Sequence, residues 1–275
     1  MSDQVNATQD FGLNFFRTLT PWRVSDQAFA LAYDATGDRG RALIKTALAA
    51  LFEAGQPGRP VSRAVAEGFH SGLSRTEELL TRPWFLLILA PDVLSPAQVA
   101  AAVMPALALR IPVLAVREGA RASWPPAVLA AFELAGVEQV FAPPKEHFTR
   151  FLKELGGQEG GAVCLGDRPF WARARALVPP ERRVHWLAVP ESAGLYRAPD
   201  VHWDEKTLAF AHAGLRFVEY GPMPEPADKT SWAFFAPAAK APASAGLVLE
   251  PGREALWDWP DMPGHLFFSR RLVYG

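Results

Sequence analysis

The sequence is poor in cysteine and carries almost no net charge. Its 275 residues include one cysteine, Cys164, which excludes an intrachain disulfide and a zinc site built from several cysteines. The 28 basic and 29 acidic residues give a net charge of −1. This balance lacks the basic excess typical of nucleic-acid-binding domains, so we expect no nucleic-acid partner.

Long apolar runs and a leader are also missing. No apolar stretch of the sequence reaches the roughly 18–20 residues that cross a bilayer. Residues 1–6 lack the basic and apolar regions that are typical of a signal peptide. We therefore expect a cytoplasmic protein that has no membrane partner.

Several signatures of catalysis and nucleotide binding are absent as well. The sequence has no Gly-x-Gly-x-x-Gly fingerprint, no Walker A loop and no Gly-x-Ser-x-Gly nucleophile elbow. Around His185, His202 and His212, no spacing presents two metal ligands on one helical face. We therefore predict no metal site.

What the sequence does contain is an alternation of strand-type and helix-type patterns between about residues 84 and 220. Strongly apolar strings lie at residues 84–90, 111–116, 137–141, 162–165 and 184–189. Such strings are typical of strands buried on both faces, and the spacers are long enough for crossover helices. The pattern predicts an α/β fold with a mostly parallel, Rossmann-like sheet flanked by helices.

The spacers and the two ends of the chain complete the expected organisation. Helices are expected near residues 95–109, 124–135, 145–155, 169–178 and 204–213, several of them starting at Ser-Pro or Trp-Pro steps. We divide the chain into an N-terminal helical element (1–82), a Rossmann-like domain (83–221) and a Pro- and aromatic-rich, irregular extended segment (222–275) that packs on the sheet or on a partner. Within the first part we expect helices at 26–35 and 39–54, then a helix plus an edge hairpin at 61–82.

Residues 126–141 resemble a segment of histidinol dehydrogenase, in which a helix that ends in Leu-Ala-Gly-Val leads into a strand. The resemblance extends over about residues 84–220. It implies the architecture of the aldehyde dehydrogenase superfamily, which has two Rossmann-like domains, and it makes NAD(P) the candidate cofactor.

The functional motifs of that family are altered in this sequence. Its Pro-Gly-Gly loop corresponds to residues 90–93 and its Gly-Gly-Ala-Gln to residues 142–145, and both have lost their glycines. Its Gly-Pro-Gly-Asn and Gly-Pro-Ser-Glu correspond to residues 164–167 and 188–192, and of its Gln-x-x-His zinc pair only His212 is retained. These departures imply a relative that keeps the scaffold and has lost the dehydrogenase chemistry.

The residues that follow the strands are the candidate site, because parallel α/β sheets bind ligands beyond the carboxyl ends of their strands. We expect Asp92, Lys145, Gly166, Asp167, Arg168 and Glu191 to cluster there.

The turn Gly166-Asp167-Arg168 is the strongest part of this site. It follows a strand and opens a helix, so free backbone N–H groups and the helix dipole point toward the crevice. Gly166 permits close approach, and Arg168 is suited to a phosphate or carboxylate. The alternative is a tight turn in which Asp167 caps the helix.

Two further groups have a chemical and a structural interpretation. Cys164 is either the nucleophile of an aldehyde dehydrogenase-like site or a small hydrophobe, and its apolar surroundings favour the second. Glu146 and His147 are either an acid–base pair or a solvated first turn. Adjacent helical residues point about 100° apart, which favours the solvated turn.

Trp257 and Trp259 stand two residues apart in a proline-rich stretch, where local burial is difficult. We expect them to cap the crevice or to form an intersubunit contact, since aromatic residues are enriched at interfaces.

Three functions are consistent with these features. The first is a non-catalytic or catalytically degenerate dehydrogenase-like protein that binds a small anionic ligand or a protein partner at the strand ends. The second is an NAD(P)-dependent oxidoreductase with an atypical site built on Cys164 or His147. The third is a structural homodimer subunit that pairs through residues 222–275.

Overall fold

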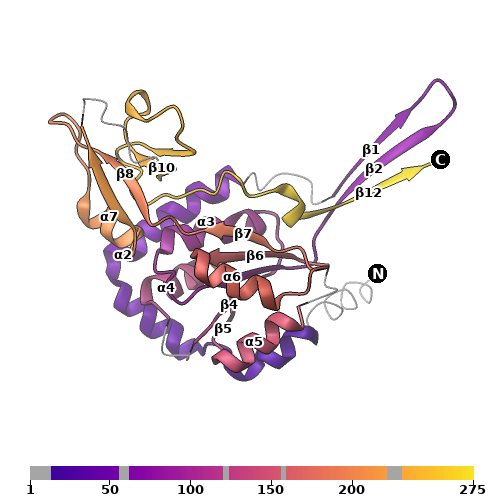
Figure 1. Ribbon diagram of the computed structural model, residues 1–275, viewed down its shortest axis with the longest axis horizontal. Helices are drawn as coiled ribbons and strands as arrows, with labels where there is room; N and C mark the ends of the chain where they lie inside the picture. Colours follow the sequence, from indigo (N-terminus) through magenta and orange to yellow (C-terminus); the bar gives the residue numbers. More distant parts are fainter. Residues whose placement is uncertain (1–13, 56–61, 120–123, 156–158, 222–230) are drawn as a thin grey trace.

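The computed structural model describes residues 14–55, 62–119, 124–155, 159–221 and 231–275. Its body is a five-stranded parallel sheet with helices on both faces, which confirms the predicted α/β, Rossmann-like fold (Figure 1). The strands, in the spatial order β5-β4-β3-β6-β7, are Gln139–Phe141, Val113–Arg117, Phe85–Leu89, Gly161–Gly166 and His185–Ala188.

The central strand β3 shows why this sheet forms. All five of its residues are buried, and it pairs on one side with β4 and on the other with β6. Leu87, for example, lies opposite Ala115 and Val163. A strand covered on both faces and both edges needs a continuous apolar string rather than alternation.

Helices connect the strands close to the predicted positions. They are α3 (Pro96–Ala108), α4 (Pro126–Ala135), α5 (Lys145–Lys153), α6 (Arg168–Leu177) and α7 (Glu205–Ala211). The Ser95 hydroxyl caps α3 by accepting a hydrogen bond from the Gln98 amide, and Gly136 ends α4 in the left-handed region at φ 75°. Helix α2 packs on α3 and α4, whereas α5 packs on α6.

The first two helices of the chain confirm the prediction. The element α2 (Asp26–Ala54) consists of two helical stretches that match the helices expected at 26–35 and 39–54, and it follows a short 3₁₀ helix, η1 (Asn14–Trp22). The break between the two expected helices survives as a kink at Gly37, whose φ of 66° a glycine adopts without strain.

A second, smaller sheet brings the C-terminal segment onto the body. Its order is β11-β10-β8-β9, formed by Leu247–Leu249, Ala233–Phe235, Ser192–Tyr196 and Arg216–Tyr220, and all its pairs are parallel. A side chain at Gly194 would overlap the ring of Phe234, at 2.3 Å, so this glycine lets the two strands pack. The division of the chain into three parts stays a prediction.

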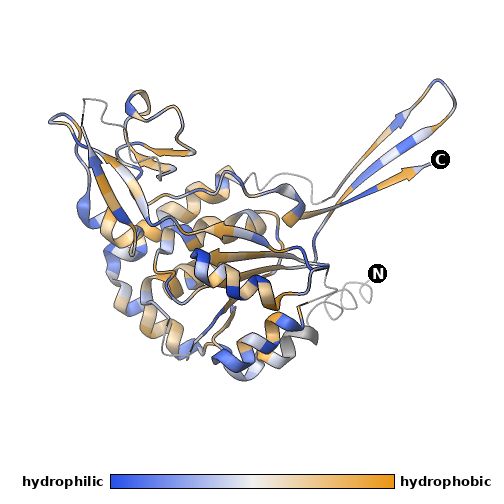
Figure 2. Cartoon of the chain, viewed as in Figure 1, coloured by the Kyte–Doolittle hydropathy of each residue, from blue (hydrophilic) through white to orange (hydrophobic). Residues whose placement is uncertain are grey.

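The third sheet is an antiparallel arm that projects from the body (Figure 1). It consists of β1 (Ser62–Gly68), β2 (Ser74–Thr81) and β12 (Phe268–Tyr274), in that order. The hairpin expected within 61–82 is therefore present, and the helix expected beside it is absent from the described residues 62–82. Blue and orange residues are mixed along the arm, whereas the central strands of the body are mostly orange (Figure 2).

Trp257 and Trp259 correct another expectation. They are only 1% and 5% exposed, and the indole of Trp259 donates a hydrogen bond to the Gln98 carbonyl at 3.0 Å. The two residues are therefore part of this chain's own core and are not free for an intersubunit contact. No helix among the described residues is long and apolar enough to cross a membrane.

Candidate functional site

The candidate site is a crevice at the point where the strand order of the main sheet reverses. From β3 the chain moves outward to β4 and β5, whereas β6 and β7 lie on the other side of β3. Ligands of open α/β sheets bind at such a switch point, outside the carboxyl ends of the strands. The loops after β3 and β6 there border an open crevice of about 410 Å³, lined by Pro91, Asp92, Asp167, Pro169, Phe170 and Arg173.

Two of the predicted residues meet in this crevice. Asp92 follows β3 and Asp167 follows β6, and both line it. Asp92 is an exposed residue, yet the crevice walls remove part of the water around its carboxylate, which raises its pKa. The negative charge of Asp167 raises this pKa further, and the positive charge of Arg117 opposes the rise.

Asp167 caps helix α6. Its carboxylate accepts a hydrogen bond from the Phe170 amide at 2.8 Å, and its carbonyl accepts one from the Trp171 amide at 3.0 Å. Pro169 has no backbone N–H to offer. The first turn of α6 therefore has few donors left, and it carries a fixed negative charge where an anion would have to bind.

Gly166 is required for packing. A side chain at this position would lie 2.6 Å from the Cβ atom of Ala90 and 2.9 Å from the ring of Phe170. The small residue thus lets the turns after β3 and β6 pack together. This requirement accounts for Gly166 without a ligand.

Three charged residues of the crevice region were missed by the sequence reasoning. Arg117 and Glu118, at the end of β4, are only 4% and 8% exposed. The Arg117 guanidinium donates to the Pro91 carbonyl and lies 5.4 Å from the ring centre of Trp124, and burial lowers its pKa. Glu118 forms an ion pair with Arg173 of α6. A charged pair directly after the apolar string 111–116 was the available signal.

The remaining predicted residues do not join this crevice. Lys145 begins α5, after edge strand β5, and Glu191 follows β7, the opposite edge strand, so the sheet order separates them. Both side chains are exposed. Arg168 is also exposed, at the first position of α6, and is not part of the crevice lining.

The residues considered above as a nucleophile, an acid–base group or a metal ligand lie outside the crevice lining. Cys164 lies within β6 at 0% exposure, and burial raises the pKa of its thiol. His147 is exposed, with its ring 4.1 Å from that of Trp22. The ring nitrogen Nε2 of buried His212 hydrogen-bonds the Glu254 carbonyl at 2.8 Å, and burial lowers its pKa to about 4. Within the described residues, no group of His, Cys, Asp and Glu side chains is arranged to hold a metal ion.

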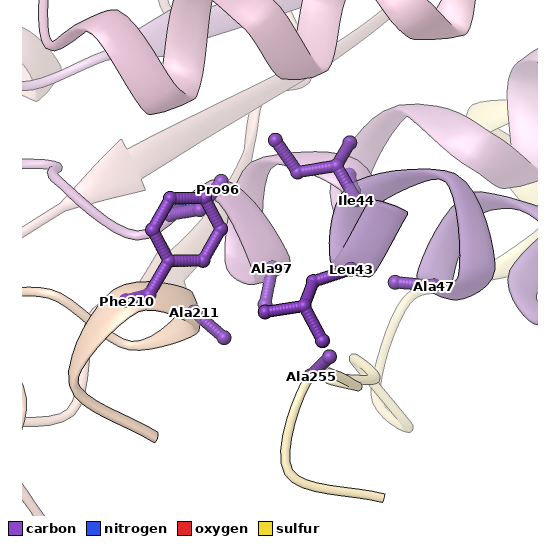
Figure 3. A pocket seen from close by; sticks show the side chains of 9 residues that line it. Leu43, Ile44, Ala47, Pro96, Ala97, Phe210, Ala211 and Ala255 are labelled. Atoms are coloured by element: carbon purple, nitrogen blue, oxygen red, sulfur yellow. The ribbon is translucent and has the colours of Figure 1, made fainter. Parts of the chain in front are cut away.

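An apolar cavity between α2, α3 and α7 is a poor candidate for a ligand site. In Figure 3 the side chains of Leu43, Phe210 and Ala255 surround it. Its volume is about 10 Å³, which is close to the least that holds one water molecule. It is therefore a packing gap in an apolar contact between helices.

Comparison with known proteins establishes the fold and no more. No protein-family model and no curated protein matches the chain. Among solved structures, the fold is similar to that of histidinol dehydrogenase from Elizabethkingia anophelis, with a TM-score of 0.60 and 11% identity over 98% of this chain and 79% of that chain. This similarity confirms the resemblance predicted from residues 84–220.

Aldehyde dehydrogenases are also among the similar structures. Succinate-semialdehyde dehydrogenase from Burkholderia pseudomallei has a TM-score of 0.42 and 15% identity, over 74% of this chain and 45% of that one. Succinic semialdehyde dehydrogenase from Streptococcus pyogenes, in complex with NADP+, has a TM-score of 0.44 and 12% identity, over 86% of this chain and 55% of that one. The chain thus spans about half the length of these enzymes.

Proposed function

We propose that this protein is a catalytically degenerate, dehydrogenase-like scaffold that binds a small ligand or a protein partner at the strand ends. The observation that carries the proposal is the position of Cys164. The chain's one thiol is at 0% exposure inside β6, where burial raises its pKa. A reactive cysteine needs an exposed, electropositive setting that favours the thiolate.

The alternative of an NAD(P)-dependent oxidoreductase has less support. Backbone N–H groups that hold a pyrophosphate must be free, and glycines let the backbone approach it. At this crevice the loop after β3 reads Ala90-Pro91-Asp92, and Asp167 occupies the N-terminus of α6. A dinucleotide would therefore meet two carboxylates with few backbone donors to offset them.

The charged side chains of the crevice also indicate what charge the ligand carries. The sequence led us to expect a small anion, and Arg173 supplies a positive group in the crevice lining. However, Arg173 is paired with Glu118, and Arg117 donates to the Pro91 carbonyl, whereas Asp92 and Asp167 face the crevice together. We therefore favour a ligand with a cationic or hydrogen-bond-donating group over an anion. We place this function in the cytoplasm, where thiols such as Cys164 stay reduced.

A thermal-shift series tests this proposal. Spermidine, citrate, NAD and NADP serve as the cationic, anionic and dinucleotide probes. A probe that binds only the native state stabilises it by about 2.7 kcal/mol at 100 times its dissociation constant. We expect a shift with spermidine that is lost in Asp92→Asn and kept in Glu191→Gln, a matched exposed acid outside the crevice lining. A shift with NAD or NADP that Asp92→Asn abolishes would overturn the proposal.

A homodimer is the second candidate, and the arm is the observation that favours it. The arm carries exposed apolar side chains on its strands and its hairpin turn: Phe69, Leu73, Leu80, Leu272, Val273 and Tyr274, at 37–58% exposure. Leu272 and Tyr274 share one face of the arm, whereas Leu80 and Val273 lie on the other, and a small sheet with exposed apolar side chains is marginal in water. Three ion pairs already lie within the arm, among them that of Arg270 with Glu77. A second copy that buries the apolar side chains is therefore the simplest partner.

The test of this dimer uses substitutions in place of truncation. Deleting residues 222–275 would remove the buried Trp257 and Trp259, so the loss of a dimer would be ambiguous. The variant Leu272→Asp/Tyr274→Asp changes only exposed arm positions. Sedimentation should show a dimer for the natural chain and a folded monomer for this variant. If the natural chain stayed monomeric when its concentration in the sedimentation experiment was raised about a hundredfold, the proposal would be contradicted.

A further inference from the structure

A second groove lies along the edge of the main sheet, apart from the crevice at the switch point. The residues of strand β7 (His185–Ala188) all line it, and its volume is about 330 Å³. The indoles of Trp171, Trp186, Trp232 and Trp259 line it, together with His185 and Asp261. The chain has nine tryptophans, so nearly half of them border this one groove.

The indoles are held in place by contacts with one another and with the body. The ring centres of Trp171 and Trp186 are 6.3 Å apart, and those of Trp232 and Trp259 are 6.1 Å apart. The hydrogen bond from Trp259 to the Gln98 carbonyl fixes one wall to α3. A rigid aromatic lining costs little conformational entropy when a ligand binds.

The walls come from distant parts of the chain. Trp171 lies on α6 and Trp186 on β7, whereas Trp232 and Trp259 belong to the C-terminal segment. The C-terminal segment thus converts an open sheet edge into a groove. Its volume is near the lower end of the roughly 300–1,000 Å³ of ligand pockets, which suits a single ring with a short substituent.

The polar groups of the groove are few and specific. Asp261 is exposed and supplies a carboxylate at the rim. His185 is half-buried, and burial lowers the pKa of its imidazole, an effect that nearby His265 increases and Asp261 opposes. Burial therefore favours the neutral form of this imidazole, and Asp261 is the acidic side chain among the lining residues. One cation already lies against this aromatic set, because the Arg175 guanidinium is 4.9 Å from the ring centre of Trp186.

We propose that this groove binds a planar aromatic ligand that carries an amine. The ring lies among the indoles, where offset and edge-to-face contacts are favourable. The ammonium group pairs with Asp261 and gains from the neighbouring indole faces. Asp92 and Asp167 take no part, so this site is independent of the function proposed for the crevice.

Fluorine NMR of the protein labelled with 5-fluorotryptophan tests the proposal residue by residue. Benzylamine is the probe, and benzyl alcohol and benzoate are the neutral and anionic comparators. Benzylamine should shift the resonances of Trp171, Trp186, Trp232 and Trp259, assigned by single Trp→Phe variants. The resonance of Trp22, which is outside the groove lining, should stay in place. Shifts at other tryptophans only, or none, would overturn the proposal.

A pair of surface variants tests the role of the charge. Asp261→Asn should weaken benzylamine binding about fivefold, the effect of one exposed ion pair, and leave benzyl alcohol unchanged. Asp200→Asn is the control, because Asp200 is also exposed and does not line the groove. If benzoate bound as well as benzylamine, or Asp261→Asn had no effect on benzylamine, the assignment of an amine would be wrong.

Discussion

The main sheet and the arm are built from the same kind of element and meet opposite environments. In β3 every residue is buried, with neighbours on both edges and helices on both faces. In β12 every residue from Arg270 to Tyr274 is exposed, although the strand pairs with β2 along its whole length. Backbone pairing is therefore present in both strands and does not by itself show how strongly each strand is stabilised. The main sheet is stabilised by burial, whereas the arm has surface left to bury.

The largest effect should come from truncating the main sheet. Leu87→Ala removes a fully buried side chain, so the free energy of unfolding should fall by about 3–5 kcal/mol. Leu272→Ala is the same change in the arm, where the side chain is 41% exposed, and it should cost about 0.5 kcal/mol in dilute solution. Urea denaturation of both variants measures this difference. Similar losses would show that the arm is as well packed as the sheet.

Acid should destabilise the smaller sheet through His212. Burial lowers the pKa of this residue from 6.5 to about 4, because its ring is 1% exposed among Phe235, Phe217 and Trp257. The unfolded state binds the proton first, so stability is full above pH 6.5 and falls as the pH drops toward 4. The loss should be about 3 kcal/mol.

Denaturation curves between pH 7 and pH 4 check this dependence. His212→Gln should be less stable at pH 7 and should lose less on acidification than the natural chain. His147→Gln, a change at an exposed histidine, is the control variant. An unchanged pH profile in His212→Gln would assign the acid sensitivity to another group.

Gly166 distinguishes the packing interpretation of the crevice from the ligand interpretation. Gly166→Ala places a Cβ atom 2.6 Å from that of Ala90, so the two turns must shift, at a cost of about 1–3 kcal/mol. Gly68→Ala is a control in the arm, where a Cβ atom would meet nothing within 4 Å. The thermal unfolding midpoint should be lower for Gly166→Ala than for Gly68→Ala. A stable Gly166→Ala variant that fails only in ligand binding would favour the ligand interpretation.

The smallest effect expected outside the arm concerns the cap of α6. Asp167→Ala removes the hydrogen bond to the Phe170 amide and should cost about 1 kcal/mol. Asp167→Ser retains a capping oxygen without the charge, and its stability should be close to that of the natural chain. If Asp167→Ser lost as much as Asp167→Ala, the charge rather than the cap would be the stabilising feature.

The main sheet could be predicted because short, local sequence patterns determine its strands and the starts of its helices. Each apolar string, such as residues 84–90, contains its strand within a few residues, and the helix starts at Ser95 and Asp167 follow from capping chemistry. The arm could not be predicted in full. Its third strand pairs Arg270 with Leu79, far away in the sequence, and no local pattern specifies such a partner.

The candidate site was predictable only in part for the same reason. Asp92 and Asp167 meet because the strands before them are neighbours, whereas Lys145 and Glu191 follow opposite edge strands. The sequence shows which residues follow a strand, but it does not show the order of the strands. Trp257 and Trp259 were misjudged because the surface that buries them comes from distant segments of the chain.

The most direct test of the proposed function is a hydride-transfer assay with NAD and NADP, a panel of aldehydes and amino alcohols, and the Cys164→Ala variant. The absorbance of the reduced cofactor is recorded for the natural chain and the variant, with a thiol reagent added to a parallel native sample. We expect no turnover above background and no modification of Cys164 in the folded protein. Reduced cofactor formed by the natural chain and lost in Cys164→Ala would contradict the account of a degenerate scaffold.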